Sequence, residues 1–237
     1  MTDHTVKAFT EQLEGLSALV AQMGGLAEAQ FASAIEAISR RDSNAADSAV
    51  GGDARIDAIQ QEIEDRALKL LALRQPMAVD LRETLAAIKT AAELERIGDL
   101  AKNIAKRALV LNREPPIRLT QSLGRMGRAA LGQLKQVLDA YSSRNAEEAE
   151  LVWNQDGEID EIYNSLFREL LTYMMEDPRT IGLSTHLLFI AKNIERCGDH
   201  ATNIAEVVYH MVRADHLANN RPKADTTSET SFEARQA

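Results

Sequence analysis

The sequence predicts an all-α protein made of two tandem three-helix bundles that are related by an internal repeat. Hydrophobic residues make up 45% of the 237 residues but aromatic residues only 4%, and there are 5 prolines, a composition that favours helices over a β-sandwich. Apolar residues recur with a period near 3.6 along six long segments. The eleven residues at 95–105, ERIGDLAKNIA, return at 195–205 as ERCGDHATNIA, with eight identities. An internal repeat of this kind constrains the architecture before any propensity is considered.

Three helices are predicted in the first half. The first covers residues 5–40. The second begins at Asp42, a good N-cap residue, and ends before Pro76, which cannot continue a helix. The third covers residues 79–112.

The second half of the chain follows Pro115-Pro116, which breaks the helical pattern. Three more helices are predicted there: residues 119–142, a segment from Asn145 to just before Pro178, and residues 180–217. Antiparallel neighbours joined by short loops are typical of helix bundles.

The two halves repeat the same order of features. The pattern Asp-x-x-Ile-Asp-x-Ile at 53–59 returns at 156–162. We therefore predict a first bundle over residues 1–114 and a second over 115–217. Residues 218–237 are rich in Thr, Ser and charge, and this composition is typical of a disordered tail.

A glycine pair at Gly51-Gly52 lies inside the second predicted helix and costs roughly 1 kcal/mol per glycine relative to alanine. A break at this point would give a seventh, short segment. The equivalent stretch of the repeat, residues 152–155, has no glycine pair, and this favours a continuous helix with a weak point.

The charge balance limits the possible partners. The formal net charge is −9 with a sequence pI of about 5.1, so binding to nucleic acid or to an anionic membrane surface is not expected. Cys197 is the only cysteine, which rules out an intrachain disulfide. The first residues lack a signal-peptide pattern and no apolar run reaches the ~18 residues that span a bilayer. A soluble cytoplasmic protein is expected, and docking on a membrane protein stays open.

Acidic residues four apart recur in matched places of the two halves. With about 100° per residue, Asp99 lies about 40° and Asn103 about 80° from Glu95, whereas the apolar residues lie near 180–240°. The acidic residues of this helix therefore point away from its apolar face, and its repeat has the same geometry. The related acidic residues of the second and fifth helices lie on the flank of their apolar faces and are also predicted to point outward. The candidate metal ligands are Asp53, Asp57, Glu95, Asp99 and Asn103 in the first half, and Asp156, Asp160, Glu195, Asp199 and Asn203 in the second, with Gln61 and Asn164 in line with them.

Two interpretations of these carboxylates stay open. Carboxylate and amide oxygens are hard ligands suited to Mg²⁺, Mn²⁺, Ca²⁺ or iron, and a bound cation would offset the repulsion between like charges four residues apart. The alternative is that they form solvated faces of acidic helices. A ferritin-like di-iron enzyme is disfavoured, because such enzymes point their ligands into the core and use Glu-x-x-His, which the chain lacks.

Four further positions of the repeated phrase carry expectations. Gly98 and Gly198 are mid-helix glycines, which favours close approach of a neighbouring helix over backbone access for a ligand. Cys197 lies on the apolar face and is expected to be an inert core residue. His200 is expected at the surface.

Taken together, four pieces of the chain resemble the PhoU family of phosphate-transport regulators. They are MGGL at 23–26, QPMAVDLR at 75–82, LERIGD at 94–99, and FIAKNIERCGDHATNIAE at 189–206. The resemblance extends from about residue 4 to residue 216, and Cys197 stands where an aliphatic residue is usual.

The resemblance implies a function that spacing alone does not give. Members of this family are two three-helix bundles in a pseudo-twofold arrangement. They act as negative regulators of the phosphate-starvation response, coupling a phosphate ABC transporter to a sensor histidine kinase and keeping the kinase inactive when phosphate is plentiful. Some bind multinuclear iron, Mg²⁺ or Mn²⁺ at Glu/Asp-x-x-x-Asp motifs. These motifs correspond here to Glu95–Asp99, Glu195–Asp199, Asp53–Asp57 and Asp156–Asp160.

The expected protein is thus a non-enzymatic adaptor, a homodimer, with no organic cofactor. The alternatives that remain are a metal-dependent hydrolase or oxidase, a purely structural helical scaffold with no metal, a metal-binding helical scaffold, and a paralogue that serves another transporter. The absence of a Gly-rich phosphate loop, a nucleophile beside a base or a zinc motif favours the adaptor.

Overall fold

The computed structural model describes residues 2–74, 78–115, 120–217, 225 and 227, with the side chains of residues 2–9, 74 and 156 left undescribed. The protein is all-α, and the described residues contain no strand. The α-helices are α1 (Thr2–Ser39), α2 (Ser43–Gly51), α3 (Asp53–Arg74), α4 (Ala78–Leu111), α5 (Thr120–Ser143), α6 (Ala146–Asn154), α7 (Asp156–Glu176) and α8 (Ile181–Arg213), with the 3₁₀ turn η1 (Pro178–Thr180) before α8. None of the described helices is both long enough and apolar enough to span a bilayer.

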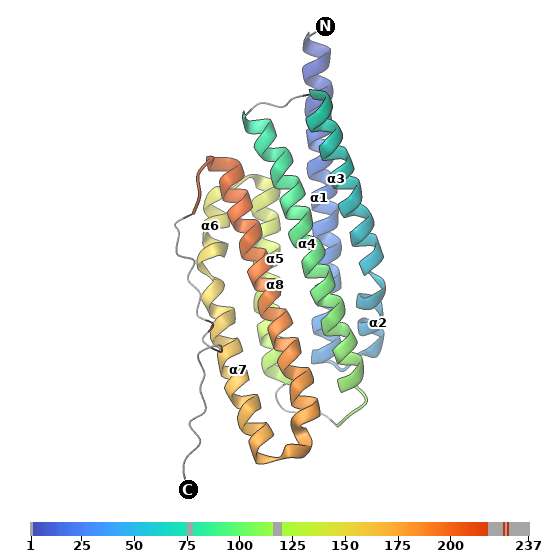
Figure 1. Ribbon diagram of the computed structural model, residues 1–237, viewed down its shortest axis with the longest axis vertical. Coiled ribbons are helices and arrows are strands. Elements are labelled where there is room, and N and C mark those ends of the chain that lie inside the picture. The colour runs from blue at the N-terminus through green and yellow to red at the C-terminus, as the bar shows by residue number, and fades with distance from the viewer. Residues whose placement is uncertain (1, 75–77, 116–119, 218–224, 226, 228–237) are drawn as a thin grey trace.

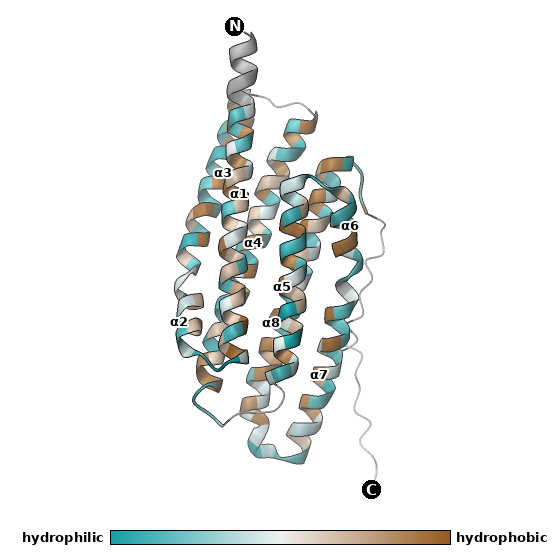
Figure 2. Cartoon of the chain, turned by 180° about the vertical axis from the view of Figure 1, so that it is seen from behind, coloured by the Kyte–Doolittle hydropathy of each residue, from teal (hydrophilic) through white to brown (hydrophobic). Residues whose placement is uncertain are grey.

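The long helices lie nearly parallel or antiparallel in two groups. Helices α1, α3 and α4 pack on one another, and so do α5, α7 and α8, whereas α4 against α8 and α1 against α5 join the groups (Figure 1). Hydrophobic and hydrophilic residues alternate along these helices, as expected for amphipathic helices that each bury one face (Figure 2). The buried apolar side chains of both groups form one continuous cluster. The predicted division into two bundle domains at residue 114 stays a prediction.

Most predicted helix ends agree with the structure. The second and fifth predicted helices begin where expected, because Asp42 accepts hydrogen bonds from the amides of Asn44 and Ala45, and Asn145 accepts one from the amide of Glu148. The last helix ends at Arg213, four residues before the predicted end, with Ala214 in the left-handed conformation at φ 55°.

The prediction that the second and fifth helices are continuous is wrong. A single residue, Gly52 or Gln155, interrupts each of them. The carbonyl of each interrupting residue accepts a hydrogen bond from the amide three residues later, Arg55 or Glu158, as in a 3₁₀ turn. In each case, a buried glutamine from a neighbouring helix accounts for the interruption by bonding to a backbone carbonyl near it. Gln30 Nε2 donates to the Ala49 carbonyl at 2.7 Å, and Gln133 Nε2 donates to the Gln155 carbonyl at 3.0 Å. Side chains that bond to helix carbonyls are a known cause of kinks.

The repeated glycines allow close helix packing. A Cβ atom at Gly98 would lie 3.1 Å from Ile56 Cδ1 of α3, and one at Gly198 would lie 2.8 Å from Ile159 Cδ1 of α7. The packing role predicted for both glycines is confirmed. Cys197 is also confirmed as a core residue, and burial raises the pKa of its thiol.

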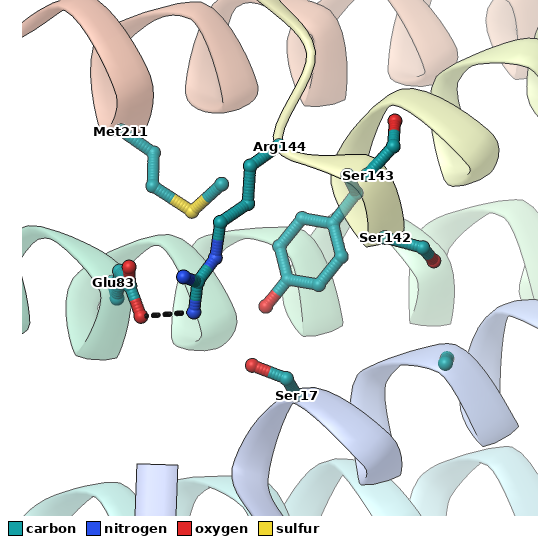
Figure 3. A pocket seen from close by; sticks show the side chains of 8 residues that line it. Ser17, Glu83, Ser142, Ser143, Arg144 and Met211 are labelled. Atoms are coloured by element: carbon teal, nitrogen blue, oxygen red, sulfur yellow. Dashed lines mark hydrogen bonds and ion pairs between the residues drawn. The ribbon is translucent and has the colours of Figure 1, made fainter. Parts of the chain in front are cut away.

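A polar cavity of about 350 Å³ lies where the two groups of helices meet (Figure 3). Arg144, from the loop between α5 and α6, reaches across to Glu83 of α4, and Nη2 lies 2.8 Å from Oε2. Burial raises the pKa of the Glu83 carboxyl, and the Arg144 charge opposes that shift. This ion pair ties α4 to the second half of the chain.

Most of the predicted disordered tail, residues 218–237, lies outside the described residues. Asp225 and Thr227 are the exceptions. Asp225 contacts Lys192 and Asp160 in the second half, and Thr227 contacts Tyr163 there.

Candidate functional site

The structure brings four of the predicted ligands together where α3 packs on α4. This first acidic cluster consists of Asp53, Asp57, Glu95 and Asp99. Burial, followed by repulsion from Asp53 and Asp99, raises the pKa of Asp57. Burial is also the main cause that raises the pKa of Glu95, and the charges of Asp99, Asp57 and Asp53 add to it. The cluster is therefore an electrostatically coupled group from two helices.

A lysine lies among these carboxylates. Lys102 of α4 forms an ion pair with Asp53, and its Nζ lies 4.0 Å from Asp99 Oδ1. The hydrogen bond to Asp53 is the main cause that raises the pKa of Lys102. The first cluster thus already attracts one cation, its own ammonium group.

The second acidic cluster lies between α7 and α8 and contains Asp160, Glu195 and Asp199. Asp156, the fourth predicted ligand in this half, begins α7, but its side chain is outside the described residues. Asp160 is only 4% exposed and Glu195 only 5%. The prediction that the acidic residues face solvent is therefore wrong for these two residues, because they lie in the contact between the two helices and beside Asp225.

Lys192 supplies the cation of the second cluster. Its Nζ lies 2.7 Å from Glu195 Oε1, while the other oxygen, Oε2, is buried and has no hydrogen-bond partner among the described residues. Burial raises the pKa of Glu195 to about 7, Lys192 opposes this shift, and Asp199 and Asp160 add to it. A buried acceptor without a donor is costly and marks this carboxylate as one that a further cation would stabilise.

The predicted amide ligands do not join the clusters in the same way. Asn103 is exposed. Asn203 instead donates from Nδ2 to Glu93 Oε2 of α4 at 3.1 Å. His200 contacts the same oxygen through Nδ1 at 2.6 Å, and its side chain is only 17% exposed, so the expectation of a surface histidine is wrong.

Sequence reasoning missed Glu93, Lys102 and Lys192. Burial alone would raise the pKa of Glu93, but hydrogen bonds from His200 and Asn203 outweigh burial and lower it. The two lysines could have been found from their spacing, since Lys102 follows Asp99 by three residues and Lys192 precedes Glu195 by three, a distance at which helical side chains meet.

The donor set fits a hard divalent cation, although the side chains are not arranged around one. Carboxylate oxygens suit Mg²⁺, Mn²⁺ or iron. Within the residues that the structure describes, no three His, Cys, Asp or Glu side chains form a group that could hold a metal ion. Binding would therefore require the carboxylates to converge and the lysine of each cluster to move aside.

The pKa of Glu195 predicts a stability change with pH in the metal-free protein. The unfolded carboxyl ionises near 4.5 and the folded one near 7, so its contribution to stability is complete below pH 4.5 and is lost as the pH rises through 7. Between pH 5 and 8, the wild type should lose on the order of 2 kcal/mol of unfolding free energy relative to Glu195→Gln. Urea unfolding in the presence of a chelator checks this. Parallel pH profiles for the two proteins would contradict it.

A PhoU domain model matches residues 20–108 and 123–208 of this chain. Among relatives, the phosphate-specific transport system accessory protein PhoU homolog of Caulobacter vibrioides is 55% identical over 97% of this chain and 100% of its own length. The homolog from Rhizobium meliloti is 49% identical over 95% of each chain.

Solved structures are similar over nearly the whole fold. PhoU from Pseudomonas aeruginosa superposes with a TM-score of 0.85 at 36% identity, covering 87% of this chain and 100% of its own. The phosphate transport system regulatory protein PhoU from Streptococcus pneumoniae has a TM-score of 0.81 at 28% identity, covering 89% of this chain and 99% of its own. Both copies of the repeated phrase lie within the matched domains. The chain therefore belongs to the PhoU family.

Proposed function

We propose that this protein is a negative regulator of the phosphate-starvation response. In this proposal it is a cytoplasmic adaptor that couples a phosphate ABC transporter to a sensor histidine kinase and represses signalling when phosphate is plentiful. The observation that carries the proposal is the likeness, over 97% of the chain, to a relative named as a phosphate-specific transport system accessory protein. It reaches the membrane through these partners.

The two acidic clusters are the groups of residues through which we expect it to act. Asp53, Asp57, Glu95 and Asp99 would hold a divalent cation in the first half, and Asp160, Glu195 and Asp199 would hold one in the second. A bound Mg²⁺, Mn²⁺ or iron would supply positive charge that neutralises mutually repelling carboxylates. Since each cluster draws on two helices, the ligands would also tie α3 to α4 and α7 to α8.

The architecture proposed with this function is a pair of bundles, residues 1–114 and 115–217, assembled as a homodimer. Support for self-association comes from exposed apolar side chains at the turn between α7 and α8, where Tyr173, Met175 and Ile181 are 41%, 67% and 48% exposed. The role is non-enzymatic. Phosphoester turnover that disappears with Asp99→Ala would favour the metal-dependent hydrolase instead.

A reporter of phosphate-starvation genes tests the regulatory role. In a bacterial strain that lacks its own PhoU-family protein but keeps its transporter and kinase, we expect high output in excess phosphate. Re-expression of this chain should restore low output, whereas an empty vector should not. Output that is low without the protein, or that stays high with it, would contradict the proposal. That result would favour a paralogue serving another transporter or a metal-binding scaffold.

A further inference from the structure

Two residues beyond the end of α8 lie against the second acidic cluster. The amide of Asp225 donates to Asp160 Oδ2 at 3.1 Å, and Lys192 Nζ donates to Asp225 Oδ2 at 2.9 Å. The Asp225 side chain is 21% exposed. A segment far along the chain from α7 thus contacts a predicted ligand of the cluster and the lysine that serves it.

The local structure around Asp225 holds its carboxylate in place. Thr227 donates to Asp225 Oδ1 from its amide at 2.9 Å and from its hydroxyl at 2.7 Å, which leaves Oδ2 for Lys192. A side-chain hydrogen bond joins Thr227 to Tyr163 of α7 and acts to lower the pKa of Tyr163, which burial raises overall. Asp225 and Thr227 therefore contact both helices that form the cluster.

Lys192 explains why an acidic segment can bind beside acidic residues. Its ammonium group lies between Glu195 and Asp225 and 5.0 Å from the centre of the Tyr163 ring. Burial would lower the pKa of Lys192, but the hydrogen bonds to Glu195 and Asp225 raise it. Burial would raise the pKa of Asp225, but hydrogen bonds from Thr227 and Lys192 lower it. A raised pKa for the lysine and a lowered pKa for the aspartate are the shifts expected of an attractive ion pair.

The first cluster is built differently. The residue that corresponds to Lys192 in the repeat is Ala92, and the ammonium group comes instead from Lys102, which lies within the repeated phrase. The tail follows only the second copy. Two clusters that the sequence presents as equivalent are thus unequal in the folded chain.

We propose that Asp225 and Thr227 form an intramolecular cover of the second acidic cluster. Asp225 docks on Asp160 and Lys192, so a cation that binds this cluster must first displace it. The docking does not depend on the proposed function, but the competition with a cation rests on the proposed metal site.

A spin label on the tail tests the docking in full-length, metal-free protein. Ser228→Cys places a labelling site next to Thr227, and Cys197→Ala removes the buried native thiol. The nitroxide spectrum should be dominated by a slow component in this background and should shift mostly to a fast component with Asp225→Ala. Asp215→Ala is the matched control, because it removes the same charge from a carboxylate that accepts from the amide of His216. Docking is contradicted if Asp225→Ala leaves the spectrum unchanged, or if Asp215→Ala frees the label equally.

Titration with Mg²⁺, which leaves nitroxide spectra unbroadened, tests the cover. Mg²⁺ should increase the fast component of the labelled protein, and calorimetry should give severalfold tighter Mg²⁺ binding to Asp225→Ala than to wild type. A label that slows further with Mg²⁺ would make Asp225 a ligand and overturn the cover. Mg²⁺ that binds the protein without changing the mobility of the label would also contradict the cover. If neither protein binds Mg²⁺, the proposed metal site fails, while the metal-free spectra still decide the docking.

Discussion

Replacing Asp99 and Asp199 together with alanine should lower the affinity of the protein for Mn²⁺ by about tenfold or more, which corresponds to roughly 1.4 kcal/mol or more. Asp99 contributes to the coupled carboxylates of the first cluster, and Asp199 raises the pKa of Glu195 in the second. Each substitution removes a carboxylate that is proposed as a ligand from a cluster that has few of them. Both residues lie within long helices, so the helical content should persist.

The measurement is metal content after dialysis against Mn²⁺, together with a Mn²⁺ titration and far-ultraviolet circular dichroism. A double variant with Asp47→Ala and Asp139→Ala is the matched control, because it removes the same charge from exposed positions on α2 and α5. The control should bind Mn²⁺ like the wild type. Full metal occupancy in the Asp99→Ala, Asp199→Ala protein would show that the site assignment is wrong, and equal losses in both variants would show only a general effect of charge.

Replacing Phe31 with alanine should cost about 3–5 kcal/mol of unfolding free energy. Phe31 is fully buried and lies on α1, which packs against α4 of its own half and α5 of the other. The cost combines the lost transfer free energy of the ring with the cavity left between helices that cannot fully close it.

Phe189→Ala makes the same chemical change at a half-exposed position. The Phe189 side chain is 49% exposed, and the Arg107 guanidinium lies 4.2 Å from its ring centre, a contact worth about 0.5–1 kcal/mol. Urea denaturation of both variants checks the difference. Similar losses at the two positions would contradict the single continuous core that joins the halves.

The sequence predicted the helices better than their interruptions. The apolar period of 3.6 residues and the positions of the prolines predicted the ends of the long helices to within a few residues, because both signals are local to each segment. The interruptions at Gly52 and Gln155 coincide instead with hydrogen bonds from Gln30 and Gln133, which belong to other helices. A glycine pair marks only the first interruption, so comparison of the two copies favoured a continuous helix where the structure has a break.

At the candidate site too, the sequence predicted contacts within one helix but not contacts between helices. Spacing along one helix correctly grouped Glu95 with Asp99 and Asp53 with Asp57, but it could not tell how deeply α7 and α8 bury Asp160. The sequence also gave no sign of the contacts that Asn203 and His200 make with Glu93, because these cross from α8 to α4. Such contacts belong to the packing of the two halves and follow no pattern within a single helix.

The measurement that tests the central claim most directly is repression by the cluster variant in cells. The strain without its own PhoU-family protein would express, at equal levels, the wild-type chain, the Asp99→Ala, Asp199→Ala variant or the Asp47→Ala, Asp139→Ala control. Reporter output in excess phosphate should be low with the wild type and the control and high with the cluster variant. Full repression by the cluster variant would contradict the claim that the two acidic clusters carry the regulatory function.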